Sequence, residues 1–231
     1  MDMSNIRLTD NSVRILTKTI SDKAIFYIII DHIVRNIPMS IVRMGDGEQI
    51  ILYKYFNEDS ELYISDIFDN EWTTRMGYVN AKVKDAYKYI IEAEETCTYF
   101  APNLAGTIYP SFNLYKYFKE RDFYVDNFFV NVISHENIDA IYKVAKKILI
   151  IHAEPKLGNI ATTKLNNDNY SFEYLQLTNW DQVDDVVKKA GESDNKLILI
   201  SGSKVIGPRL ANKYSKICID IGNTMDHWLF S

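Results

Sequence analysis

The C-terminal half of the chain alternates continuous apolar runs with amphipathic stretches. An apolar run bounded by charge is typical of a strand covered on both faces, whereas valine or leucine at helical spacing predicts an amphipathic helix. The pattern predicts strands over residues 146–152, 172–177, 196–200 and 216–221, with helices over 180–190 and 205–214. Strands that alternate with helices indicate βαβ units and a parallel sheet with right-handed crossovers.

The N-terminal half carries a weaker pattern. Ser21 is a suitable cap for a helix that runs through about Arg35 and is stopped by Pro38. Further on, the pattern predicts strands over 40–44, 96–100 and 128–132, and helices over 49–56, 79–94, 112–121 and 136–145. No internal repeat or low-complexity linker is visible. We therefore expect a single α/β domain over 1–231, with an N-terminal helical segment (1–38) and a Rossmann-like core (39–231) whose mostly parallel sheet is flanked by helices.

Composition narrows the function classes. The formal net charge of −5 gives no basic field over the whole molecule, which argues against a nucleic-acid partner. Cys97 and Cys218 lie in apolar, strand-like runs without metal or dithiol spacing, so we expect two reduced core thiols. No apolar run approaches the roughly 20 residues that span a bilayer, and no secretory signal is visible. The expected location is the cytoplasm, with a peripheral role at a membrane still open.

Two acids separated by one glycine follow the strand predicted over 40–44. Asp46 and Glu48, in the run Arg43-Met44-Gly45-Asp46-Gly47-Glu48, could hold Mn²⁺ or Mg²⁺ against a phosphate, because hard cations prefer oxygen ligands. The alternative is structural: Asp46 could cap the next helix, with Glu48 in a first turn that favours negative charge. Arg43 could bind a diphosphate or hold one of the acids in an ion pair.

Two further loops follow predicted strands, where open parallel sheets bind ligands. Gly202 and Ser203 could bind an anion through backbone amides, or Ser203 could cap the next helix. Their loop is neither a Walker A motif nor a dinucleotide fingerprint. His152 and Glu154 are candidates for a catalytic base, although a histidine that ends an apolar strand is more often structural.

The run 40–48 resembles the Arg-x-Gly-Asp-Gly-Glu segment of bacterial GT-D type glycosyltransferases. A second similarity lies in 199–211, a strand, glycine turn and helix, which lead into Ile219-Asp220-Ile221-Gly222. The resemblance implies a Rossmann-like fold, a divalent metal held by Asp46 and Glu48, and a nucleotide-sugar donor. The chain departs from the family after Gly222, where Asn223 stands in place of the usual histidine.

The sequence thus predicts a metal-dependent hexosyltransferase that uses a donor such as a UDP-sugar and a glycan or glycoconjugate hydroxyl as acceptor. The donor-binding residues would be Arg43, Gly45, Gly47, Gly202 and Ser203. Three questions stay open: whether the reaction inverts or retains, which sugar moves, and whether the protein forms homo-oligomers. The alternatives are a noncatalytic subunit of a glycan-assembly complex and a metal-dependent phosphohydrolase.

Overall fold

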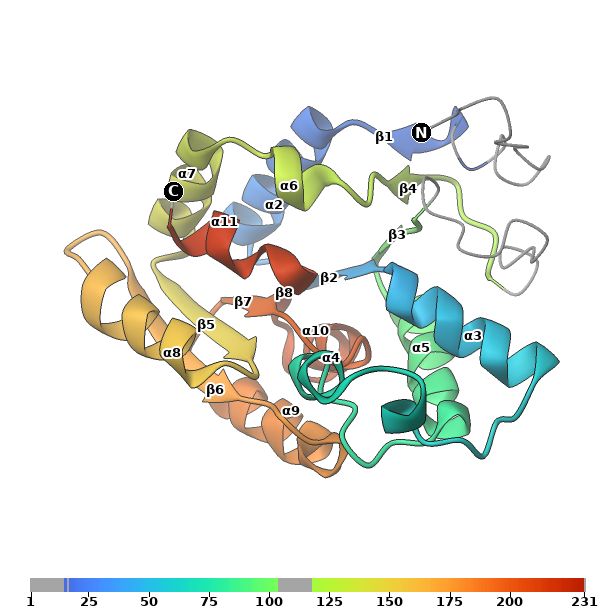
Figure 1. Cartoon of the computed structure of the whole chain (residues 1–231). Coiled ribbons are helices and arrows are strands. Elements are labelled where there is room, and N and C mark those ends of the chain that lie inside the picture. Colours follow the sequence, from blue (N-terminus) through green and yellow to red (C-terminus); the bar gives the residue numbers. More distant parts are fainter. Residues whose placement is uncertain (1–14, 16, 104–117, 231) are drawn as a thin grey trace, which may run out of the picture.

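The chain folds around one six-stranded sheet whose strands are all parallel (Figure 1). The structure is a computed structural model that describes residues 15, 17–103 and 118–230. The strand order across the sheet is β3-β2-β8-β7-β5-β6. The strands are β2 (Met39–Arg43), β3 (Tyr99–Ala101), β5 (Lys147–His152), β6 (Ser171–Gln176), β7 (Leu197–Ile200) and β8 (Ile217–Asp220). The predicted mixed α/β class, with a mostly parallel sheet flanked by helices, is confirmed.

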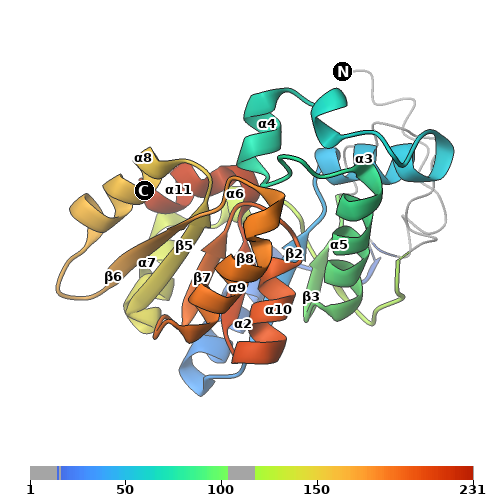
Figure 2. The ribbon, with the colours of Figure 1, turned by 90° about the horizontal axis from the view of Figure 1, so that it is seen from below.

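Helices cover both faces of this sheet. One face packs against α3 (Asp46–Asn57), α5 (Val83–Thr96), α9 (Val183–Glu192) and α10 (Ile206–Tyr214). Figure 2 shows α5, α9 and α10 lying across that face. The other face packs against α2 (Asp22–Arg35), α6 (Phe129–Val132), α7 (His135–Ala145) and α11 (Met225–Leu229). Each central strand is therefore buried on both sides, which is why it reads as a continuous apolar run.

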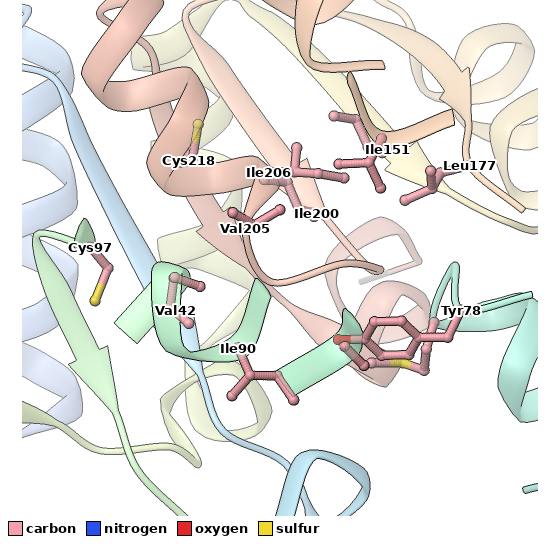
Figure 3. Close-up of a cluster of buried hydrophobic side chains, with 14 of the residues drawn as sticks. Val42, Tyr78, Ile90, Cys97, Ile151, Leu177, Ile200, Val205, Ile206 and Cys218 are labelled. Carbon is pink, nitrogen blue, oxygen red and sulfur yellow. The ribbon is translucent and has the colours of Figure 1, made fainter. Parts of the chain in front are cut away.

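The core on the α5 and α10 face joins the sheet to the helices above it (Figure 3). Val42 and Ile200 come from strands, Ile90 from α5 and Ile206 from α10, and all four are buried. Cys218 lies in the same cluster and, as predicted, both cysteines are buried free thiols. Burial raises the pKa of the Cys97 thiol to about 12, which keeps it protonated and unreactive at neutral pH.

Short elements complete the fold around the sheet. The strands β1 (Thr19–Ile20) and β4 (Tyr124–Val125) form a separate parallel pair. The short helices are η2 (Ile64–Asp66), α4 (Asn70–Arg75), α8 (Pro155–Ile160), η4 (Ala161–Leu165), η5 (Trp180–Gln182) and η6 (Gly222–Thr224). Within the described ranges, no helix is long and apolar enough to cross a membrane.

Four predicted elements need correction. Residues 128–132 were expected to form a strand, but Phe129–Val132 form α6, since the periodicity of so short a segment does not distinguish a helix from a strand. The helix predicted over 79–94 begins at Val83, and the helix predicted from residue 49 begins at Asp46. Residues 112–117 of the helix predicted over 112–121 lie outside the described residues, and 118–121 are not helical.

The chain leaves two neighbouring strands toward opposite faces of the sheet. After β2 it enters α3, and after β8 it enters η6 and α11 (Figure 1). The loops that follow these strands therefore separate, which leaves space between them. Ligands of open α/β sheets bind at such a crevice, outside the carboxyl ends of the strands.

Candidate functional site

Asp46 and Glu48 lie at this crevice, on the first turn of α3. Gly45 is the N-cap of the helix, and its backbone amide donates to Glu48 Oε2 at 2.8 Å. The predicted structural alternative is thus partly right, but Gly45 rather than Asp46 caps the helix. Because Glu48 closes the cap, its carboxylate has a fixed position at the start of α3. Glu48 therefore both caps α3 and lines the pocket at this crevice.

Glu48 is a buried acid, with 1% of its surface exposed. Its Oε1 atom makes no hydrogen bond to any described residue and lies 3.5 Å from Lys204 Nζ. A carboxylate in this position would be costly without a nearby positive charge. Lys204 supplies that charge.

Lys204 is buried between two acids. Its Nζ donates to Asp220 Oδ2 at 2.8 Å, across from Glu48. Burial by itself would lower the pKa of Lys204, but the charges of Asp220 and Glu48 outweigh it and the pKa is raised. The ammonium group therefore stays charged at neutral pH. Asp220 also accepts from the backbone amides of Arg43 and Gly222, both at 3.1 Å, so it joins the ends of β2 and β8.

Arg43 extends this network to the other side of the crevice. Its Nε donates to the Asn127 backbone oxygen at 3.0 Å and to Asn127 Oδ1 at 3.1 Å, while Nη1 donates to the Ile221 oxygen at 3.0 Å. Burial lowers the pKa of Arg43, and the charges of Asp220 and Glu48 oppose that shift. A Cβ added at Gly222, where φ is +51°, would lie 2.9 Å from Arg43 Nη1, so the glycine admits the guanidinium.

Asp46 points to a different environment from that of Glu48. It is exposed, and its Oδ1 accepts from Asn103 Nδ2 at 2.6 Å. Asn103 is itself held by Gln49, whose Nε2 donates to the Asn103 backbone oxygen at 3.2 Å. The exposed carboxylate of Asp46 thus lies two residues before the buried carboxylate of Glu48 on the same turn of α3.

A pocket of about 400 Å³ opens between these residues, and we call it the β2–β8 pocket. It is lined by Arg43, Gly45, Asp46, Gly47, Glu48, Trp72, Met76, Asn131, Lys204, Gly222, Asn223 and Thr224. Gly47 has a clear packing role here. A Cβ at this position would lie 2.0 Å from Trp72 Cζ2, so only glycine lets the indole of α4 lie against the start of α3.

Several buried polar atoms in this region make no hydrogen bond to any described residue. They are Tyr78 Oη, Ser201 Oγ and Ser203 Oγ, in addition to Glu48 Oε1, which has only its ion pair with Lys204. Burial raises the pKa of Tyr78 well above its usual value, and the charges of Glu48 and Asp220 act in the same direction. The phenol therefore keeps its proton. Buried polar groups are rarely left unsatisfied, so these atoms are suited to ordered water or a ligand.

The structure brings together only part of the predicted site. Arg43, Gly45, Asp46, Gly47 and Glu48 share the β2–β8 pocket. In contrast, Gly202 and Ser203 do not line it. Ser203 is not a cap either, because α10 begins at Ile206 after Val205. Their neighbour Lys204 reaches the pocket instead, through its side chain rather than through backbone amides.

His152 and Glu154 lie at the carboxyl end of β5, in a neighbouring pocket. The Glu154 amide donates to His152 Nδ1 at 2.8 Å, so Nδ1 is an acceptor and the neutral ring carries its proton on Nε2. This tautomer does not offer the basic nitrogen to a substrate from its Nε2 side. Glu154 is exposed and caps α8. Of the two predicted base candidates, Glu154 is the one with an exposed side chain, whereas His152 is buried.

The donor set suits a divalent cation that takes few protein ligands. Asp46 and Glu48, whose Oε1 makes no hydrogen bond, offer hard carboxylate oxygen atoms at the pocket wall. No group of three or more His, Cys, Asp or Glu side chains forms a metal site among the described residues. Magnesium commonly binds through one or two carboxylates and completes its shell with water and substrate phosphates. The residues present fit that mode of binding.

Sequence reasoning missed the residues that hold this site together. Lys204 and Asp220 are a buried ion pair, yet each lies beside residues that the sequence analysis had already singled out. An aspartate inside the apolar run 216–221 was the available signal, because buried acids need partners. Trp72 and Asn103 had no such signal, since their contacts depend on how α4 and the end of β3 pack against α3.

Comparisons with known proteins support the fold. No family model matches the chain, and no curated protein matches it. The chain is similar to one solved structure, which is described in these words: the highly conserved domain of unknown function 1792 has a distinct glycosyltransferase fold. The match covers 94% of this chain and 83% of that one, with a TM-score of 0.56 and 15% sequence identity. The chain therefore has a glycosyltransferase-like fold.

Proposed function

We propose that the protein is a metal-dependent glycosyltransferase of the GT-D type. It would move a hexose from a nucleoside-diphosphate sugar, such as a UDP-sugar, to a hydroxyl of a glycan or glycoconjugate. The observation that carries this proposal is the β2–β8 pocket, in which Asp46 and Glu48 lie beside the cations Lys204 and Arg43. A metal-bound diphosphate needs carboxylates for the metal and cations for the phosphate oxygens, and this pocket offers both.

The charges around the pocket favour a divalent cation with the donor. The carboxylates of Asp46, Glu48 and Asp220 outnumber the cations Arg43 and Lys204 by one. A diphosphate alone would increase this negative excess, and a divalent cation held by Asp46 and Glu48 would offset it. When bound, Mn²⁺ or Mg²⁺ would supply Lewis-acid stabilisation of the leaving diphosphate.

The residues of the chain would share the remaining work. Lys204 and Arg43 would place fixed positive charge beside the diphosphate, in a pocket where charge interactions are stronger than in water. The bond from the anomeric carbon to the diphosphate oxygen would break, and its electron pair would leave with the nucleoside diphosphate. The acceptor oxygen would bond to the anomeric carbon, and in an inverting reaction its proton would pass to Glu154.

The test is a donor screen by thermal shift, with and without Mn²⁺. A donor that binds only the folded protein raises its apparent melting temperature, and we expect this shift to require metal and nucleotide sugar together. Asp46→Asn and Glu48→Gln should each remove the shift. Glu136→Gln is the control, since Glu136, like Asp46, is an exposed acid in the first turn of a helix, α7, but lies outside the pocket.

Activity then separates the rival functions. Sugar transfer that depends on an acceptor supports the proposal. Cleavage of simple phosphate esters without an acceptor would replace it with a phosphohydrolase. A metal-dependent shift without turnover of any donor would indicate a noncatalytic subunit. Full transferase activity in both acid variants would contradict the metal site.

A further inference from the structure

A second pocket adjoins the β2–β8 pocket. It has a volume of about 600 Å³ and lies between the carboxyl end of β5 and the helix α11. We call it the β5–α11 pocket. Six of its lining residues carry the argument: His152, Glu154, Leu157, Asn223, Asp226 and Phe230. None of them belongs to the charge network of Glu48, Lys204 and Asp220.

The two pockets have a common wall. Gly222, Asn223 and Thr224 line the β2–β8 pocket, while Asn223, Met225 and Asp226 line the β5–α11 pocket. One short segment, residues 222–226, thus faces both, and Asn223 belongs to each. A ligand in one pocket therefore lies next to a ligand in the other. A group-transfer reaction requires this juxtaposition, because both substrates must meet at one atom.

The side chains of the β5–α11 pocket differ in kind from those of its neighbour. Asn223 and Asp226 are exposed, and neither side chain forms a hydrogen bond or ion pair with any residue of the described ranges. Phe230 is 47% exposed at the end of α11, and Leu157, also in the lining, is half-buried. The pocket therefore combines uncommitted hydrogen-bonding groups with apolar surface.

We propose that the β5–α11 pocket binds the acceptor, and that the acceptor is a neutral sugar. This inference rests on the proposed function. Carboxylates such as Asp226 and Glu154 accept hydrogen bonds from sugar hydroxyls, which are donors, and Phe230 offers an aromatic face to the C–H side of a pyranose ring. Asn223, on the common wall, would contact the acceptor next to the donor.

The charge of the pocket selects against an anionic acceptor. Glu154 and Asp226 are both acids, and Lys156 is the cation that accompanies them in the lining. A phosphate or carboxylate ligand would meet like charge at two positions, whereas uncharged hydroxyls can use both carboxylates as acceptors. The ligand class is thus a neutral glycan or glycoside rather than a phosphorylated carrier headgroup.

The test measures binding of methyl glycosides of glucose, galactose and N-acetylglucosamine by saturation-transfer NMR on the full chain. At least one should bind to the wild type. Asp226→Asn should weaken it about tenfold, because the amide oxygen that replaces the carboxylate is an uncharged and weaker acceptor. Phe230→Ala should weaken it about fivefold through lost apolar contact.

Two control variants match these changes outside the pocket. Asp168→Asn removes an exposed acid from the turn before β6, and Tyr27→Ala removes an aromatic ring that is 70% exposed on α2. Both should bind the glycoside as the wild type does. UDP with Mn²⁺ is titrated in parallel, because its binding tests the β2–β8 pocket separately.

The outcomes distinguish the two hypotheses. Glycoside binding that falls in both pocket variants and in neither control supports the acceptor site. If UDP and Mn²⁺ bind but no glycoside does, or if the pocket variants bind the glycoside normally, the acceptor site is wrong and the donor site stands. If the glycoside binds and no nucleotide does, the proposed transferase function fails while the sugar pocket remains.

Discussion

The two neighbouring pockets are built in opposite ways. In the β2–β8 pocket the decisive groups are buried and paired with one another, as Glu48 and Asp220 are with Lys204. In the β5–α11 pocket, Asp226 and Asn223 are exposed and unpaired within the described part of the chain. The first arrangement fixes a charge pattern before a ligand arrives, and the second leaves side chains free to adjust. This difference suits the two proposed ligands. A rigid pocket would bind the diphosphate, which is the same group in every nucleotide-sugar donor, and an adaptable pocket would bind an acceptor sugar.

The largest expected effect comes from removing the buried cation. Lys204→Met leaves Glu48 and Asp220 uncompensated, and breaking such a buried pair costs about 3 to 5 kcal/mol of the free energy of unfolding. Lys156→Met, at the rim of the β5–α11 pocket, should change it by less than about 0.5 kcal/mol. Urea denaturation of both variants measures the difference.

A double variant guards the first experiment against simple misfolding. Glu48→Gln combined with Lys204→Met removes one of the stranded charges and should recover part of the lost stability. Equal losses for Lys204→Met and Lys156→Met would contradict the contrast between the two pockets.

A smaller effect is expected where Trp72 packs against Gly47. Alanine favours a helix by roughly 1 kcal/mol over glycine, but a Cβ 2.0 Å from the indole should cost about 1 to 3 kcal/mol. Gly47→Ala should therefore destabilise the wild type and stabilise a Trp72→Ala background. Thermal denaturation of the four proteins tests this reversal of sign. The same loss in both backgrounds would place the strain elsewhere.

The smallest effect concerns Tyr174, whose hydroxyl donates to the His152 backbone oxygen at 2.8 Å beside the β5–α11 pocket. Burial, with the charge of Glu154, raises the pKa of Tyr174 from 10.0 to about 12. The folded protein thus keeps a proton that the unfolded chain loses, so this contribution is present below pH 10 and is lost between about pH 10 and pH 12.

Tyr174→Phe should cost about 1 kcal/mol at neutral pH through the lost hydrogen bond. Its stability should then fall less steeply than that of the wild type as the pH rises through this window, as urea denaturation at several alkaline pH values would report. Parallel profiles for the two proteins would show that the phenol does not titrate as described.

The sequence could predict the sheet but not its surroundings. Strands such as β5 and β8 are buried on both faces, so their continuous apolar runs could be predicted as strands from the sequence alone. The segment from η2 through α4 mixes aromatic and polar residues without a clear period, and it was not assigned to any element. The same limit explains α6, whose four residues suit a helix or a strand equally well.

For the site, adjacency along the chain was predictable and adjacency across the sheet was not. Asp46 and Glu48 share one turn, so their motif was visible. Lys204 meets Glu48 only because β8 lies between β2 and β7, a strand order that no local pattern specifies. For this reason the sequence suggested an anion site at the amides of Gly202 and Ser203, or a helix cap at Ser203, whereas the side chain of Lys204 is the group that reaches the pocket.

The bond between Arg43 and Asp220 joins residues that are 177 positions apart. On the ribosome, Glu48 therefore emerges long before the lysine and aspartate that surround it in the finished fold. Until β8 inserts beside β2, nothing holds Lys204 next to Glu48, and burial of the acid without that buried cation would be costly. Insertion of β8 beside β2 thus completes both the sheet and the charge network of the β2–β8 pocket.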